Sequence, residues 1–470
     1  MAPSILACGS NAASHLAINH PDDVSVLTST VYHPSLPPIS NSSQIVDLIL
    51  TSAHSLLLIS PETSPDETRP RNILLGAGTN KFGQLGPRCA LWDDIKPESR
   101  WKPLNLLNSA GIEGNWEPVQ IASTWTTSFV VYQRFIASKP VNESTESGSS
   151  STISNNDLNK LLQENDNVGQ IVISCGSNDF GELGSSSKSP LILDAPAEIP
   201  ISQASQKPTI VDLGLKADER VQLIKGGQRH VIAVINDKKN QQKVIGWGAS
   251  RKGELDPSST LSHNLSVGSS ISTSKGKGKG KAVSRLAISS PTVINLPIQH
   301  GDRIIDISLG ASHTLALLSN GTVLAWGSNL KGQISGIHEL KDIKSIAATW
   351  GGSYFLTKSD QVYSQGSNSH SQLLRGGIEV NSEIGQIDLP KGWKPKDIFA
   401  GSEHLLVHMI KDNGESQEEE EEGLWTGGWN EHGNLGLGDQ ADRSNLQKVD
   451  FRGKINGLWG GCASTWVWTD

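Results

Sequence analysis

The sequence predicts an all-β fold: a seven-bladed β-propeller closed by pairing its N-terminal strand with its C-terminal strand. One short motif, close to W/C-G-x-N-x-x-G-x-L, begins at seven places: Cys8, Gly76, Cys175, Trp247, Trp326, Gln365 and Gly428. A second unit, an apolar strand, a G-x-x-H-like turn and another apolar strand, also recurs, around His54, Thr127, His230, His313, Gly352, His404 and Ser464. Units that cannot bury their faces alone must stack on their neighbours.

The two ends of the chain complete one repeat. Residues 461–468 resemble the first half of the unit that runs unbroken from Gly310 to Asn329, and residues 5–11 resemble its second half. A closed ring allows a unit to be divided in this way, and closure also removes exposed sheet edges. We therefore expect the terminal strands to pair.

The strands are predicted from short apolar runs bounded by turn signals. Leu315 to Leu318 is such a run, and Asn320-Gly321 after it is a strong hairpin signal. The interval between motif copies is shortest from Ile334 to Leu373. We expect one blade there to lack or shorten a strand.

Three segments interrupt the repeats of a single domain at 1–470, namely 138–168, 256–290 and 411–422. All three have too few apolar residues to fold alone. The second carries alternating lysines at 275–281, which fit either a nuclear signal or a solvated loop. Because connections alternate between the faces of a propeller, 138–168 and 411–422 should project from one face. The G-x-x-H turns and G-x-N loops should share the other.

Composition limits the classes of ligand. A net charge of −8 argues against a protein that binds polyanions, so direct nucleic-acid binding is not expected. The cysteines Cys8, Cys89, Cys175 and Cys462 lack C-x-x-C spacing, and we expect neither disulfides nor a zinc site. Cys8 and Cys175 fill the motif position of Trp326 and should be buried.

The location of the protein is predicted from what the sequence does not contain. It shows no basic segment followed by an apolar signal region, and no apolar run of membrane-spanning length. We expect no membrane association and a cytoplasmic location, to which a nuclear one could be added.

The recurring histidines are the most tempting chemical groups. His54, His230, His313 and His404 occupy one position in different blades, so we expect them to pin turns rather than bind metal. The sequence has no nucleophile elbow, P-loop or dinucleotide fingerprint, and its glycine motifs do not open helices. We expect no enzyme activity and no cofactor.

Tryptophans replace ordinary turn residues on the face that carries the motif loops. Trp125 and Trp350 lie in G-x-x-H-like turns, and Trp429 is followed by Asn430, Glu431 and His432. Tryptophan is enriched at binding hot spots and also in cores, so both roles remain open. The candidate partner-binding residues are Trp125, Trp350, Trp429, Glu431 and His432.

The G-x-N and G-x-x-H motifs resemble the regulator of chromosome condensation repeat, whose domains are seven-bladed propellers. Four segments are similar to a narrower family, the fungal alpha-tubulin suppressor or killer-toxin-insensitivity proteins: residues 124–127, 401–404, 431–434 and 460–466. The insertions at 138–168 and 256–290 depart from a compact member of that family.

The narrower resemblance implies a heterodimer with a small zinc- or iron-binding protein of the CSL type. It also implies support for tRNA wobble-uridine modification through the Elongator complex and for diphthamide synthesis on elongation factor 2. The alternatives are nucleotide exchange on a small GTPase and a generic adaptor scaffold. The name-giving relative uses a basic N-terminal tail, whereas this sequence enters a predicted strand almost at once. No feature of the sequence points to tubulin.

Overall fold

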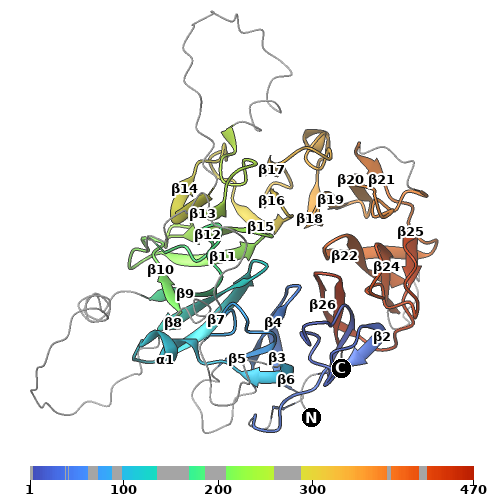
Figure 1. The fold of residues 1–470 in the computed structure, drawn as a ribbon. Coiled ribbons are helices and arrows are strands. Elements are labelled where there is room, and N and C mark those ends of the chain that lie inside the picture. Colours follow the sequence, from blue (N-terminus) through green and yellow to red (C-terminus); the bar gives the residue numbers. More distant parts are fainter. Residues whose placement is uncertain are drawn as a thin grey trace, which may run out of the picture.

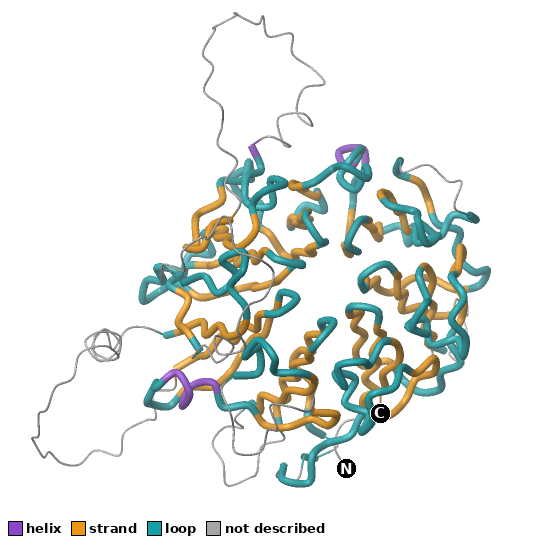
Figure 2. Tube along the Cα trace, viewed as in Figure 1, coloured by secondary structure: helices purple, strands orange, loops and turns teal. Residues whose placement is uncertain are grey.

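The structure is a computed structural model that describes residues 4–36, 39–40, 42–61, 72–86, 98–134, 169–185, 208–258, 287–377, 383–411 and 421–469. Within these ranges the strands form seven antiparallel sheets arranged around a ring (Figure 1). Strands and loops make up almost all of the trace, and helix is rare (Figure 2). The prediction of a seven-bladed all-β propeller is confirmed. No helix in the described ranges is long and apolar enough to span a bilayer.

The first sheet joins the two ends of the chain. Its order is β2-β1-β27-β26, built from β1 (Ser4–Gly9), β2 (Val24–Ser29), β26 (Ile455–Gly461) and β27 (Ser464–Thr469). The register pairs Ser4 with Thr469 and Gly9 with Ser464. The predicted closure of the ring by the terminal strands is therefore confirmed.

The other six sheets follow the chain. The second sheet contains β3 (Gln44–Leu50), β4 (His54–Ser60), β5 (Ile73–Gly78) and β6 (Glu98–Pro103). The helix α1 (Leu106–Ala110) precedes the third sheet, which contains β7 (Trp116–Ser123), β8 (Thr127–Arg134), β9 (Gln170–Gly176) and β10 (Thr209–Val211). The fourth contains β11 (Arg220–Gly226), β12 (His230–Asn236), β13 (Gln242–Ala249) and β14 (Ala287–Ile294).

The fifth sheet contains β15 (Ile304–Leu309), β16 (His313–Leu318) and β17 (Val323–Gly327). The sixth contains β18 (Ile343–Ala348), β19 (Gly352–Thr357), β20 (Val362–Gly366) and β21 (Gly385–Gln386). The seventh contains β22 (Trp393–Ala400), β23 (His404–Lys411), β24 (Glu422–Gly428) and β25 (Arg443–Lys448). The innermost strands β26, β3, β7, β11, β15, β18 and β22 contact each other in turn around the axis.

The fifth sheet is the shortened blade that the motif spacing predicts. Where its neighbours have a fourth strand, the chain after β17 forms the 3-10 helix η2 (Ile337–Glu339). The fourth strand of the sixth sheet, β21, is two residues long. The short interval from Ile334 to Leu373 thus reflects a lost outer strand.

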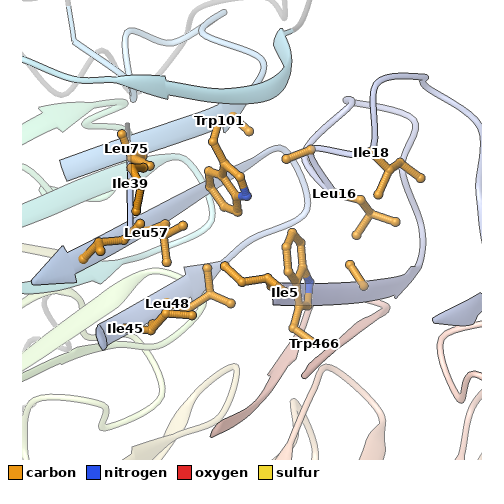
Figure 3. Close-up of a cluster of buried hydrophobic side chains, with 14 residues drawn as sticks. Ile5, Leu16, Ile18, Ile39, Ile45, Leu48, Leu57, Leu75, Trp101 and Trp466 are labelled. Carbon is orange, nitrogen blue, oxygen red and sulfur yellow. The ribbon is translucent and has the colours of Figure 1, made fainter. Parts of the chain in front are cut away.

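Apolar side chains fill the spaces between neighbouring sheets. In the cluster between the first and second sheets, Trp101 and Trp466 are fully buried, with ring centroids 5.8 Å apart (Figure 3). Ile5 of β1 packs in the same cluster. Because Ile5 and Trp466 come from opposite ends of the chain, this packing reinforces the closure of the ring.

The G-x-N motif builds a loop held by its asparagine. In six copies the asparagine Oδ1 accepts a hydrogen bond from the backbone N–H of the residue five positions later. In one of them the Ile334 N–H donates to Asn329 Oδ1 at 3.0 Å. The motif glycine that ends the strand has a positive φ in each blade, and a Cβ on Gly327 would lie 2.4 Å from the Ser312 carbonyl oxygen. Only glycine meets both conditions without strain.

The position before that glycine links neighbouring blades. Trp326 Nε1 donates to the Glu254 carbonyl at 2.9 Å, and Trp247 Nε1 donates to the Glu182 carbonyl at 2.8 Å. The thiols of Cys8 and Cys175 point to the equivalent carbonyls, those of Asn434 and Gln84. The predicted burial of both cysteines is confirmed, and this burial raises the pKa of each thiol to about 12.

The four repeated histidines also connect blades. His54, His230, His313 and His404 are fully buried, and each Nε2 lies 2.8–3.2 Å from a hydroxyl group on the next blade. In three of these turns a Cβ on the first glycine would collide with the imidazole, at 2.0 Å for Gly401. The expected structural role of the histidines agrees with this geometry.

The two faces of the ring follow the predicted alternation. In all seven blades the N–H after the motif glycine donates to the carbonyl of the residue before the histidine position, at 2.8–3.0 Å. The turns and the G-x-N loops therefore share one face, which we call the loop face. The pairs Arg134–Gly169 and Lys411–Glu421 are hydrogen-bonded at the opposite ends of their strands.

The insertion boundaries differ in part from those expected. Residues 138–168 lie outside the described residues. In the segment expected at 256–290, β14 already begins at Ala287, and in 411–422 the terminal residues Lys411 and Glu422 belong to strands. The outer strand β14 is largely exposed, so its serine-rich start reads as a loop in the sequence.

Candidate functional site on the loop face

Trp125 and Trp350 meet over the propeller axis. Trp125 follows β7 in the third sheet and Trp350 follows β18 in the sixth, yet their ring centroids are 5.5 Å apart in an edge-to-face arrangement. Both rings are partly exposed and line the loop-face end of a central cavity. The structure thus brings together two predicted site residues from opposite sides of the ring.

Hydrogen bonds between neighbouring turns hold this pair in place. The Trp125 N–H donates to the Gln228 carbonyl at 3.1 Å, and the Trp350 N–H donates to the Ser402 carbonyl at 2.7 Å. The Ala311 N–H in turn donates to the Trp350 carbonyl at 3.2 Å. Because the backbones are fixed, little conformational freedom remains to be lost when a partner binds.

Side chains that the sequence did not single out complete the surroundings of Trp125. The Arg229 guanidinium lies 5.8 Å from the Trp125 ring centroid and 4.0 Å from that of Phe180. Cys462 lines the central cavity with Trp125 and Ser402, and its burial raises the pKa of the thiol to about 11. This end of the face combines aromatic rings with a cation, a composition common in binding surfaces.

Trp429 forms a second cluster on the same face. Its ring lies 5.7 Å from that of His370 and 5.4 Å from that of His432. His432 Nδ1 is 2.7 Å from Asp23 Oδ2, and His370 Nδ1 is 3.3 Å from Asp442 Oδ2. Two imidazole–carboxylate bridges between blades therefore flank a partly exposed tryptophan.

The two clusters meet at one turn. Ser402 and Glu403 are consecutive, and their carbonyls accept the N–H groups of Trp350 and Trp429, at 2.7 Å and 3.0 Å. Burial raises the pKa of the Glu403 carboxyl, while a hydrogen bond from Gln372 opposes that shift. The exposed Glu431 lies beside Trp429 in the chain. All five predicted residues thus lie on the loop face, in two adjoining clusters.

Burial sets the charge of the four repeated histidines beneath this face. Burial lowers the pKa of His54 and His230 to about 3, and of His313 and His404 to about 4, so these imidazoles are neutral at physiological pH. Among the described residues, no group of three or more His, Cys, Asp or Glu side chains could hold a metal ion.

The turn motifs identify the tryptophans but not Arg229, Phe180, His370 or Cys462. Arg229, Phe180 and Cys462 approach the Trp125 turn only through the closed ring, and no local signal marks them. His370 does have a sequence signal, because Asn368-Ser369-His370 repeats the Asn430-Glu431-His432 pattern. That repetition could have identified the bridge to Asp442.

Known proteins share both sequence and fold with the chain. A family model for the regulator of chromosome condensation (RCC1) repeat matches residues 304–333. An RCC1 domain-containing protein of Dictyostelium discoideum is 26% identical over 49% of this chain and 49% of its own length. The secretion-regulating guanine nucleotide exchange factor of Bos taurus is 29% identical over 61% of this chain and 56% of its own. The chain thus spans about half the length of these curated relatives.

Two solved structures share the fold over nearly the whole chain. Human WBSCR16 superposes with a TM-score of 0.64 at 15% identity, covering 99% of this chain and 100% of that one. Prp20p of Saccharomyces cerevisiae, described with its binding to Gsp1p and histones, gives 0.60 at 16% identity, covering 99% and 91%. The chain therefore has the propeller fold of these two structures, and its residues 304–333 match the RCC1 repeat.

Proposed function

We propose that the protein is a non-enzymatic, protein-binding propeller whose loop face pairs with a small zinc- or iron-binding protein of the CSL type. The observation that supports this proposal most directly is the Trp125–Trp350 pair, which is partly exposed and held by backbone hydrogen bonds to neighbouring turns. Tryptophans that are rigid before binding make effective interface anchors.

The identity of the partner is inferred from resemblance. The four segments similar to the fungal killer-toxin-insensitivity family, at 124–127, 401–404, 431–434 and 460–466, all contribute to the loop face or to its underlying turns. If the protein has the same role as that family, the heterodimer supports Elongator-dependent wobble-uridine modification and diphthamide synthesis in the cytoplasm. This chain would supply a surface that shields or orients the partner's metal site.

A pull-down of the tagged full chain from its native extract, followed by mass spectrometry, tests the proposal. A stoichiometric small CSL-type protein supports it. Recovery of a small GTPase in place of that protein contradicts it. A tagged Trp350→Ala variant should recover less of the partner than an equal amount of the tagged unmodified chain.

Nucleotide exchange on a small GTPase is the second candidate, favoured by the similarity to a guanine nucleotide exchange factor over 61% of the chain. It makes a different experimental prediction. The purified chain would accelerate release of a fluorescent guanine nucleotide from the GTPase that it captures. No acceleration at a saturating concentration of the chain would exclude this function for that GTPase.

A further inference from the structure

The seven G-x-N loops differ at two positions that are exposed or partly exposed. These residues lie between the asparagine position and the next glycine position, and we call each pair a loop tip. In chain order the tips are Ala12-Ala13, Lys81-Phe82, Asp179-Phe180, Arg251-Lys252, Leu330-Lys331, Ser369-His370 and Glu431-His432. Cations are therefore concentrated in the tips of the fourth and fifth blades, which are neighbours in the ring (Figure 1).

The turn of the fourth blade adds one more cation to these tips. We call the four cations the basic sector: Arg229, Arg251, Lys252 and Lys331. The Arg229 guanidinium lies over the Phe180 ring, 4.0 Å from its centroid. Lys252 Nζ reaches from the fourth blade to Ser312 Oγ of the fifth blade at 3.4 Å. The basic sector thus spans the boundary between two blades.

The four cations of the basic sector form no ion pair within the part of the chain that the structure describes. Cations on the sixth and seventh blades differ in this respect, because each of several pairs with a carboxylate. These paired cations are Lys344, Lys396, Lys411 and Arg443. The positive charge of the basic sector therefore remains available to a partner.

The buried carboxyls near these cations offset little of their charge. Glu182 interacts with Arg229, and Glu254 with Lys252. Both carboxyls are almost fully buried and accept backbone N–H groups at 2.6 Å. Burial raises the pKa of Glu182 to about 7 and also raises the pKa of Glu254. Burial thus favours their uncharged forms.

Exposed negative charge is mostly on the other side of the loop face. We take the turn positions as the two residues before each histidine position. At the tips and turns of the third to sixth blades, all of which are described, the acidic residue is Asp179, which accepts a hydrogen bond from Ser177 Oγ at 2.8 Å. Asp23 and Glu431 lie on the first and seventh blades. A nucleic acid covering the face would meet these carboxylates, so the pattern favours a protein whose negative charge is local.

Apolar side chains border the basic sector. Leu330, in the tip of the fifth blade, is 83% exposed. The Arg229 guanidinium lies 5.8 Å from the ring centroid of Trp125, which contacts Trp350. A matching partner segment therefore combines carboxylates with apolar side chains.

We propose that the basic sector is a docking site for an acidic segment of the protein that the loop face binds, an inference that rests on the proposed function. Carboxylates of that segment would pair with Arg251, Lys252 and Lys331. Its apolar side chains would contact Leu330 and the tryptophan pair.

Fluorescence anisotropy of a labelled dodecapeptide with the repeat Glu-Glu-Leu-Ser tests the charge preference without the partner. A variant with Arg251→Gln and Lys252→Gln should bind this peptide about three- to tenfold more weakly at low salt, since exposed ion pairs are individually weak. The matched control carries Lys238→Gln and Lys239→Gln, two exposed positions between β12 and β13 at the other end of the same blade. The control should bind like the unmodified chain, and both variants should keep its melting temperature.

Three results would overturn the proposal. The first is equal affinity of the two variants, or equal affinity of the unmodified chain for a peptide with Gln in place of Glu. The second is tighter binding of a single-stranded oligoribonucleotide than of the peptide, which would assign the basic sector to nucleic acid. The third is self-association in analytical ultracentrifugation that Arg251→Gln with Lys252→Gln abolishes, which would assign it to a second copy of the chain.

Titration of the same variants with the small CSL-type zinc protein separates this inference from the proposed function. Weaker binding by the variant at Arg251 and Lys252 than by the control supports both. Equal binding by the two variants overturns the docking site and leaves the proposed function standing. If the unmodified chain does not bind that protein, the proposed function is contradicted, and the peptide measurement alone decides whether the basic sector takes acidic segments.

Discussion

Trp125 and Trp350 contact each other edge to face, with ring centroids 5.5 Å apart, although 224 positions of chain lie between them. The contact requires the third and sixth blades to face each other across a closed ring. Aromatic pairs of this geometry contribute about 0.5–1.5 kcal/mol beyond the area that they bury. The same contact shapes the loop face and covers one end of the central cavity.

Replacing His313 by Ala should lower the free energy of unfolding by about 1–3 kcal/mol, because Ser353 Oγ loses its imidazole partner at 3.1 Å and a buried void is left. Urea unfolding followed by tryptophan fluorescence measures the change. His338 is exposed in the neighbouring loop, so His338→Ala should remain within about 0.5 kcal/mol of the unmodified protein. Equal losses in both variants would refute the inter-blade role.

The four buried histidines predict acid sensitivity. Burial lowers their folded-state pKa values to about 3–4, whereas the same side chains in the unfolded chain titrate near 6.5. The unfolded state therefore binds more protons between pH 6.5 and 4, and stability falls as pH drops through that window. Urea midpoints measured across this range should decline, and the decline should be shallower in His313→Ala. An unchanged slope in that variant would contradict the assignment.

Asp306 predicts the opposite dependence on pH. Its folded-state pKa is raised to about 6 by burial, so the folded state binds the extra proton and stability falls as pH rises through about 4 to 6. Lys225, Asp47 and Asp397 are the charged groups that face it in the cavity. Asp306→Asn should raise stability at pH 7.5 by about 1–2 kcal/mol, with little gain at pH 4. A loss of stability at pH 7.5 would show that the ionised carboxylate supports the fold.

The motif glycine is tested by two substitutions at similar backbone angles. Gly327 has φ +101° and a Cβ there would lie 2.4 Å from a carbonyl oxygen, whereas Gly301 has φ +98° with nothing within 4 Å. Gly301→Ala should cost about 1–2 kcal/mol from backbone strain, and Gly327→Ala about 3 kcal/mol or more. Thermal unfolding compares the two variants. Equal losses of stability in the two variants would show that the close approach of the Ser312 carbonyl to Gly327 contributes nothing.

The sequence predicts the ring and its closure because each blade repeats the same local chemistry. Asparagine Oδ1 bonds and positive-φ glycines act within a few residues, so each copy carries its own signal. The lost strand after Ile334 was likewise visible as a shortened interval. The start of β14 was missed because an exposed edge strand needs few apolar residues, and Ser289 and Ser290 resemble a loop.

The site was predicted in part. The turn tryptophans stand out because indole side chains are unusual in tight turns. Their grouping could not be predicted, since Trp125 and Trp350 meet through the geometry of the whole ring. The same holds for Arg229 of the fourth blade, which reaches Trp125 and Phe180 of the third blade. The charged residues that line the central cavity could not be predicted either, because the β-bulges decide which strand positions face the axis.

The loop face as a partner surface is the central claim, and calorimetric titration of the purified chain with a small CSL-type zinc protein tests it most directly. Trp116 and Trp125 lie near opposite ends of β7, so Trp116→Ala is a matched control for Trp350→Ala and Trp125→Ala. The account predicts a 1:1 complex weakened by about 1–3 kcal/mol in the two loop-face variants and unchanged in Trp116→Ala. Normal folding and unchanged affinity in both loop-face variants would contradict it.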